Sequence, residues 1–141
     1  VTPLAPTMGT RRFDTRFFVA PAPLDQTAAH DNEEATESVW LAPRAALEQY
    51  RDGQIELAPP QIMSLAHLAR YARMQDVVVA ARSQRPPTIL PLAHLDAGLR
   101  TIAYPGDPLH AEHKRALPGP TRLRQQGRQF LPEGGFEALF L

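Results

Sequence analysis

Residues 12–20 read RFDTRFFVA, and this stretch decides the fold that the sequence predicts. Apolar side chains fall on both faces of the predicted strand, with Phe13, Phe17 and Val19 on one face and Phe18 and Ala20 on the other. A strand that is apolar on both faces is typical of the interior of a sheet covered by helices. Pro21 would end it, because proline has no N–H to donate to a neighbouring strand. We therefore expect an internal strand over residues 13–20 of an α/β fold.

A second short strand and a helix are expected next. Residues 37–41 place Val39 and Leu41 on the face opposite Trp40. Pro43 then suits the first turn of a helix, where its missing N–H costs nothing. Gly53 suits the C-terminal cap of that helix, since glycine adopts the left-handed conformation easily. The apolar stripe of the helix consists of Ala46, Leu47 and Tyr50.

Two further helices are expected after Pro59-Pro60, with a turn between them near Arg73. The first stripe has helical spacing and consists of Ile62, Leu65, Ala66 and Ala69. The second repeats that spacing on a shifted face and consists of Met74, Val77, Val78 and Ala81. The run 77–79 is also compatible with a strand, because short apolar runs do not separate the two structures.

The remainder of the chain predicts short strands and a long loop. Residues 88–92 and 99–104 read as strands, and residues 105–120 hold four prolines and two glycines, which favours a loop. Residues 121–131 read as a hairpin with Gln126-Gly127 at its turn.

The composition excludes several classes of protein. Hydrophobic residues make up 43% of 141 residues, which is enough for a core, and the formal net charge of zero favours neither a nucleic-acid partner nor an anionic membrane surface. No apolar run is long enough to cross a membrane. The absence of cysteine fits a cytoplasmic protein. Lys114 is the only lysine among fifteen basic residues, and with fifteen prolines this usage indicates a bacterial source.

An ordered set of motifs resembles one known family. The motifs are the stretch 12–19, the acidic Glu33-Glu34 before Trp40, the helix that begins at Pro43, the segment IELAPPQ at 55–61, and a tail with YPGDP at 104–108 and PGPTR at 118–122. In this order they resemble the downstream half of Nudix hydrolases of the acyl-coenzyme A diphosphatase branch. The resemblance implies a Nudix-type α/β/α sandwich with a mixed sheet. Residues 1–141 are then expected to form a single domain that is the C-terminal portion of an incomplete sandwich.

The resemblance also implies a reaction whose machinery this chain lacks. Nudix enzymes use a glutamate-rich helix, G-x5-E-x7-R-E-U-x-E-E-x-G-U with U a large aliphatic residue, to hold Mg²⁺ or Mn²⁺ at a pyrophosphate. That box is absent from this sequence and is expected before Val1. The parent protein is therefore expected to hydrolyse a nucleoside diphosphate linked to another moiety, such as coenzyme A. The alternative is a non-catalytic binding remnant. We predict no catalytic residue and no bound metal for this chain alone.

Five charged residues are the candidates for site roles. Asp14 and Arg16 lie at strand spacing, where they either orient a catalytic helix or form a structural ion pair within the sheet. Glu33, Glu34 and Glu37 either add a metal ligand or base from a loop, or form a solvated acidic loop. His110 and His113, with Asp107, have helical metal-ligand spacing in a proline-rich segment, which makes a metal site there the weaker alternative.

The predicted strand also implies a partner. Phe13, Phe17 and Phe18 need cover on both faces, and each buried side chain of this kind contributes roughly 1.5–3 kcal/mol. We expect that cover to come from the missing N-terminal segment or from a second copy of the chain, as a homodimer.

Overall fold

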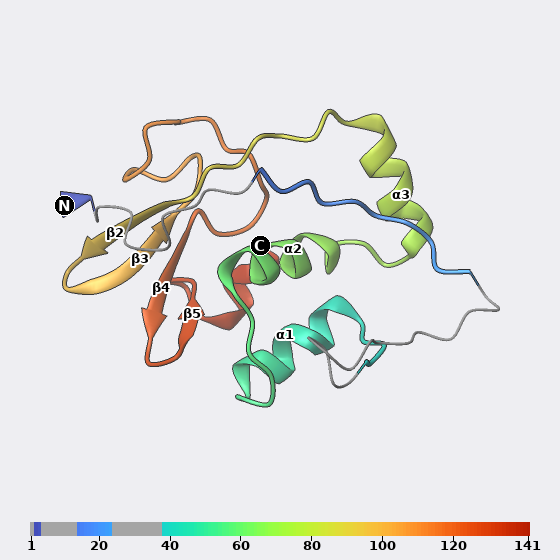
Figure 1. Cartoon of the computed structure of the whole chain (residues 1–141), viewed down its shortest axis with the longest axis horizontal. Coiled ribbons are helices and arrows are strands. Elements are labelled where there is room, and N and C mark those ends of the chain that lie inside the picture. The colour runs from blue at the N-terminus through green and yellow to red at the C-terminus, as the bar shows by residue number, and fades with distance from the viewer. Residues whose placement is uncertain (1, 4–13, 24–37) are drawn as a thin grey trace.

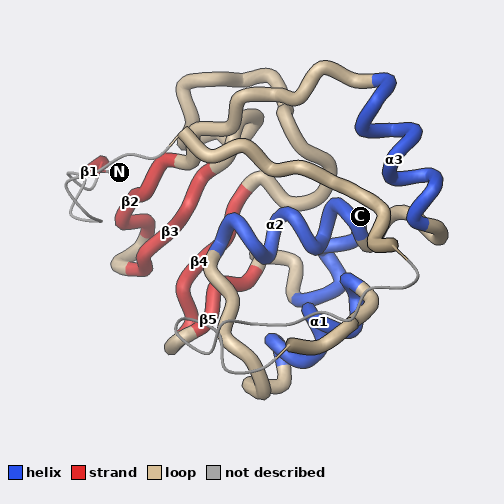
Figure 2. Tube along the Cα trace, turned by 45° about the vertical axis from the view of Figure 1, so that its right-hand side comes forward, coloured by secondary structure: helices blue, strands red, loops and turns tan. Residues whose placement is uncertain are grey.

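The computed structural model describes residues 2–3, 14–23 and 38–141 (Figure 1). The elements in chain order are β1 (Thr2–Pro3), α1 (Pro43–Arg51), α2 (Pro59–Leu68), α3 (Met74–Ser83), β2 (Leu92–Asp96), β3 (Leu99–Ala103), β4 (Arg122–Gln126), β5 (Gln129–Leu131) and the 3₁₀-helix η1 (Phe136–Phe140). The strands form one sheet in the order β1-β2-β3-β4-β5. Figures 1 and 2 show α1 and α2 beside the sheet, whereas α3 stands away from it.

The core lies between the sheet and the first two helices. Its fully buried side chains come from α1, α2, β4 and η1 and include Leu47, Ile62, Leu123 and Leu139. Tyr50 joins the two layers, because its hydroxyl accepts a hydrogen bond of 2.6 Å from the N–H of Phe130 in β5. Residues far apart in the sequence therefore share one core.

The expected helices are confirmed. Helix α1 begins at Pro43 and ends in a Schellman motif, with Gly53 at φ 73° and hydrogen bonds from Gly53 N–H to Tyr50 O and from Gln54 N–H to Gln49 O. The N–H of Ala58 is satisfied by the side-chain oxygen of Gln61 at 2.7 Å, which stabilises the start of α2. Residues 77–79 lie within α3, so the helical interpretation of that run was correct.

The hairpins are set by left-handed turns. β2 and β3 are joined by Ala97 and Gly98, both at positive φ, and such a two-residue loop matches the twist of paired strands. The expected hairpin over 121–131 is confirmed as β4 and β5. Its turn is Gly127-Arg128 and not the expected Gln126-Gly127, because Gln126 still pairs with Gln129 in the sheet. The expected strand 88–92 is displaced, because β2 starts only at Leu92 and its register follows from the turn at 97–98.

The strand expected over residues 13–20 is wrong for the described residues. Residues 14–20 are coil, and Phe17, Phe18 and Val19 are 68%, 86% and 45% exposed. The described part of the second expected strand, residues 38–41, is also coil, with Trp40 74% exposed. Both segments have apolar strand patterns, yet no described strand pairs with either, and a strand cannot form without a partner for its N–H and C=O groups.

The α/β class is confirmed by helices packed against a sheet. The expected mixed sheet is not found within the described ranges, where every strand pairing is antiparallel. Antiparallel pairing is what short two-residue turns between consecutive strands impose. No helix in the described ranges is long and apolar enough to cross a membrane.

Candidate functional site

The candidate residues taken from the sequence do not meet in one place. Asp14 and Arg16 lie exposed on the coil that replaces the expected strand, and neither forms an ion pair with another described residue. Glu33, Glu34 and Glu37 lie outside the described residues. The roles considered for these five residues therefore stay predictions.

A buried ion pair holds the loop 105–120 against the sheet. Arg122 donates to both carboxylate oxygens of Asp107, from Nε to Oδ2 at 3.0 Å and from Nη2 to Oδ1 at 2.8 Å. Asp107 is only 2% exposed, and its carboxylate also accepts from Leu109 N–H at 2.8 Å and from the Thr121 hydroxyl at 3.1 Å. Two parallel N–H···O bonds are the strongest geometry for such a pair.

This pair belongs to a larger network of alternating charge. Arg122 Nη1 lies 3.4 Å from Asp96 Oδ2, and Arg124 contacts both Asp96 and Glu133, the latter at 2.8 Å. All three carboxylates are therefore paired with arginine. Burial raises the pKa of Asp107, but the hydrogen bonds from Arg122, Leu109 and Thr121 outweigh it, so that the pKa lies below its usual range.

Gly106 shows how tightly the loop is packed beside this pair. Its φ is 96°, and a Cβ at this position would lie 2.5 Å from Cγ of Arg115. A side chain would therefore both strain the backbone and collide with the loop.

The histidines offer no metal site in the described part of the chain. His110 is buried with both ring nitrogens engaged by the main chain: Nε2 lies 2.9 Å from Leu90 O, and Nδ1 accepts from Glu112 N–H at 2.9 Å. The metal alternative for His110 and His113 is thereby contradicted, because a ligating nitrogen must be free. No group of three or more histidine, aspartate or glutamate side chains that could hold a metal occurs among the described residues.

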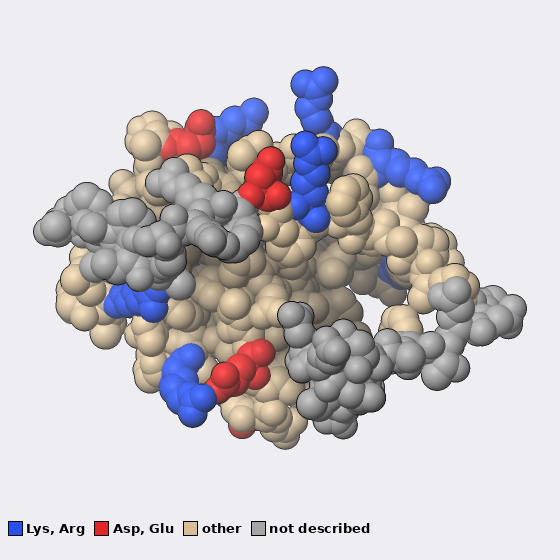
Figure 3. Space-filling view, viewed as in Figure 1, with Lys and Arg blue, Asp and Glu red and all other residues tan. Residues whose placement is uncertain are grey.

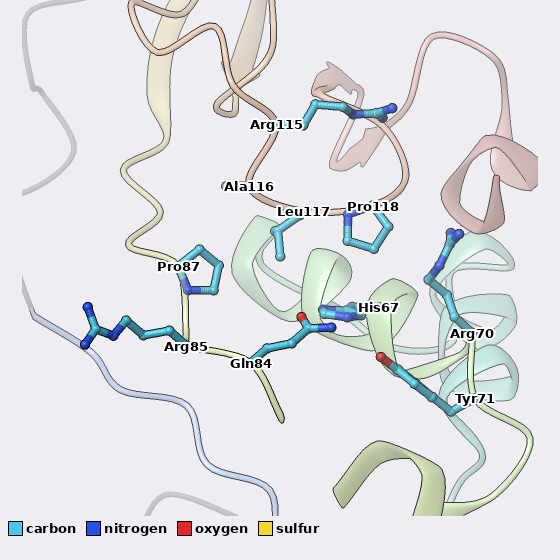
Figure 4. A pocket seen from close by; sticks show the side chains of 10 residues that line it. All are labelled: His67, Arg70, Tyr71, Gln84, Arg85, Pro87, Arg115, Ala116, Leu117 and Pro118. Atoms are coloured by element: carbon cyan, nitrogen blue, oxygen red, sulfur yellow. The ribbon is translucent and has the colours of Figure 1, made fainter. Parts of the chain in front are cut away.

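Two cavities on the described part of the chain border the loop 105–120. One, of about 400 Å³, lies over the network and is lined by Asp107, Arg122 and Glu133 together with proline and glycine residues. The other, of about 540 Å³, is bounded by residues from α2, from the segment after α3 and from the loop 105–120 (Figure 4). Its size is within the range of pockets that hold small molecules.

Comparison with known proteins finds a similarity over the first part of the chain. The family model of the NUDT19 Nudix domain matches residues 1–68. The match covers just under half of the chain, and over these residues the chain is similar to Nudix domains of that kind. This match confirms the resemblance carried by the motifs between residues 12 and 61, and it ends at the end of α2.

Similar full-length proteins carry the same family name. The acyl-coenzyme A diphosphatase NUDT19 of Xenopus laevis is 35% identical over 68 residues, which are 48% of this chain and 18% of that protein. The human acyl-coenzyme A diphosphatase NUDT19 is 27% identical over 128 residues, which are 89% of this chain and 34% of that protein. The chain thus spans about a third or less of the length of the relatives it matches. No solved structure matches this chain.

Sequence reasoning missed one contact and one cavity of this chain. Asp107 and Arg122 were noted as parts of the tail motifs but were not expected to contact each other. Their pairing could have been inferred only from the register that sets Ala103 opposite Arg122 in the sheet. The larger cavity was not foreseen either, because its lining combines three segments that are separate in the sequence.

Proposed function

We propose that the protein of which this chain is a portion is a pyrophosphohydrolase acting on a nucleoside diphosphate linked to another moiety, with coenzyme A or an acyl-coenzyme A as substrate. The observation that carries the proposal is the NUDT19 Nudix match over residues 1–68, supported by relatives named acyl-coenzyme A diphosphatase. The chain would contribute core, strands and pocket wall to that enzyme. A cytoplasmic, bacterial enzyme is proposed from composition alone.

The carboxylates of the described ion-pair network do not fit the metal that the family implies. The carboxylates of Asp96, Asp107 and Glu133 are already paired with Arg122 and Arg124, so they are not free to bind a divalent cation. The glutamate-rich box that would bind Mg²⁺ or Mn²⁺ does not occur in the sequence. No chemical step is therefore assigned to a residue of this chain.

The isolated 141-residue chain is expected to release no 3′,5′-ADP from coenzyme A in the presence of Mg²⁺ or Mn²⁺, because it carries no metal-binding box. A version of the protein that contains the box in frame is expected to release it. Chromatography of the products of both proteins under the same conditions is the measurement. Release by the short chain at the rate of the long one would refute the assignment of catalysis to the box. Inactivity of the box-containing protein would favour the alternative, a binding remnant.

We also propose that the exposed apolar side chains are covered in the functioning protein by upstream sequence or by a second copy of the chain. The support is the exposure of Phe17, Phe18 and Trp40, because covering apolar side chains of this size would stabilise the assembly that buries them. In sedimentation velocity runs the isolated chain is expected to self-associate, and Phe18→Ser to weaken the association. A chain that stays monomeric at all concentrations would exclude the second copy as the cover.

A further inference from the structure

Helix α3 carries an apolar stripe that the described part of the chain leaves largely uncovered. The stripe consists of Met74, Val77, Val78 and Ala81, at the spacing of a helix that buries one face. None of the residues of α3 is buried, and the two ends of the stripe, Met74 and Ala81, are exposed. Figures 1 and 2 show the reason, because α3 stands away from the sheet. The stripe is therefore available to a partner.

The charge around α3 has mainly one sign. Arg73 stands directly before the helix, and Arg82 and Arg85 lie in its last turn and just after it. Residues 70–90 hold four arginines and a single carboxylate, that of Asp76, whereas basic and acidic residues balance at fifteen each over the whole chain. On the face shown in Figure 3, basic side chains lie over α3 and no acidic side chain of the described residues does. The formal net charge of zero therefore conceals a local positive excess.

Two of these arginines keep their charge available. Within the described ranges Arg82 and Arg85 form no ion pair, and both are exposed. Arg73 differs, because its Nε lies 3.3 Å from Oδ2 of Asp76. Figure 4 shows the side chain of Arg85 extending away from the larger cavity. Exposed guanidinium groups without a carboxylate partner attract a surface of negative charge.

An apolar stripe with arginines at its ends is typical of a helix that lies on an anionic membrane. The apolar side chains of such a helix enter the boundary between headgroups and acyl chains, and the long arginine side chains reach back to the lipid phosphates. Binding strengthens with the apolar area buried and with each basic residue near the surface. A protein groove suits this stripe less well, because the stripe has no tryptophan or tyrosine, which usually anchor a protein interface.

We propose that α3 attaches the protein reversibly to an anionic lipid surface. Met74, Val78 and Ala81 lie at the headgroup boundary, and Arg82 and Arg85 contact lipid phosphates. The attachment is peripheral, because α3 has ten residues and a membrane-spanning helix needs about twenty.

The test uses the 141-residue chain and vesicles of equal parts phosphatidylglycerol and phosphatidylcholine, with bound protein measured by flotation. The chain is expected to float with these vesicles and not with vesicles of phosphatidylcholine alone. Added salt is expected to weaken the binding, because salt screens exposed charges. Self-association of the chain does not mimic this result, since aggregates without lipid do not float.

Two variants test the two parts of the surface. Arg82→Ala is expected to lower the partition coefficient on anionic vesicles about fivefold, the effect of one basic residue at a charged surface. Met74→Gln is expected to lower it about threefold, because the side chain keeps its length but loses apolar surface. Both residues are exposed, so the core stays intact.

Each variant has a matched control at another place in the fold. Arg128→Ala removes the same charge at the turn between β4 and β5, where the side chain is 86% exposed. Leu99→Gln removes an exposed apolar side chain at the β2–β3 hairpin, which lies at the opposite end of the molecule from α3 (Figure 1). Both controls are expected to bind vesicles like the unmodified chain.

The proposal would be overturned by no flotation with anionic vesicles, by equal flotation with neutral ones, or by equal partition coefficients of a variant and its matched control. Loss of binding in Phe18→Ser together with full binding of Met74→Gln would place the contact on the coil 14–20 and would also overturn it. The proposal does not rest on hydrolysis of coenzyme A, so the outcome of the hydrolysis assay leaves it unchanged.

Discussion

Replacing Asp107 with asparagine is expected to lower the free energy of unfolding by about 3 kcal/mol. Asp107 is buried and accepts four hydrogen bonds, two of them from Arg122. Removing one partner of a buried pair costs about 3–5 kcal/mol, because the remaining charge stays desolvated without its counter-ion. We expect the lower end of that range, because Asp96 lies 3.4 Å and Glu133 3.6 Å from Arg122 and would still offset part of its charge.

The matched control for Asp107→Asn is Glu56→Gln. Glu56 pairs with Arg128 where both side chains are at least 80% exposed. Exposed pairs contribute about 0–1 kcal/mol, so urea denaturation should show little change for this variant. If Asp107→Asn and Glu56→Gln lowered the free energy of unfolding equally, the buried pair would not stabilise the fold more than an exposed one.

The same pair sets the response of the fold to acid. The pKa of Asp107 is lower in the folded chain than in the unfolded one, so its contribution to stability is present above the unfolded value of about 3.9. That contribution is lost as the pH falls through the folded pKa. The stability difference between the unmodified chain and Asp107→Asn should therefore shrink below about pH 4.

Replacing Leu47 with alanine is expected to lower the free energy of unfolding by about 2–5 kcal/mol. Leu47 has no exposed surface and packs in the same cluster as Ile62, Leu123 and Leu139. The substitution removes three buried carbons and leaves a cavity that this surrounding layer cannot fill. The free energy of unfolding of a typical domain is only about 5–15 kcal/mol, so this loss would be a large fraction of it.

Val79→Ala is the control for Leu47→Ala. Val79 lies on α3 and is 67% exposed, and we expect its replacement to change the stability by no more than about 0.5 kcal/mol. Both variants would be compared by urea denaturation followed by circular dichroism. A change of less than about 1 kcal/mol for Leu47→Ala would contradict the position of the core.

The elements that the sequence predicted correctly are those whose signals are local. Helices α1 and α2 each begin at proline and show an apolar stripe at helical spacing, and the buried residues Leu47, Tyr50 and Ile62 fall on those stripes. The hairpin of β4 and β5 was predicted because its turn residues, including Gly127, are adjacent in the sequence. Each of these signals is complete within about ten residues.

The errors concern pairings that no local pattern determines. Residues 13–20 have the composition of an interior strand, but a strand also requires neighbours on both edges, and the pattern does not supply them. The contact between Asp107 and Arg122 and the lining of the larger cavity likewise depend on how distant segments meet. Of the candidate site, the sequence could provide the residues but not their positions relative to one another.

Helix α3 can open locally without unfolding of the core. None of its residues is buried, so few apolar contacts are lost when its hydrogen bonds break. Segments with so little buried surface open locally at a small fraction of the free energy of global unfolding, and their amide protons exchange with solvent early. Residues 84–87 follow α3 directly and form one wall of the larger cavity. Opening of α3 would thus free one end of residues 84–87 while the core around Leu47 stays folded, so that motion at the larger cavity and global unfolding are separate events.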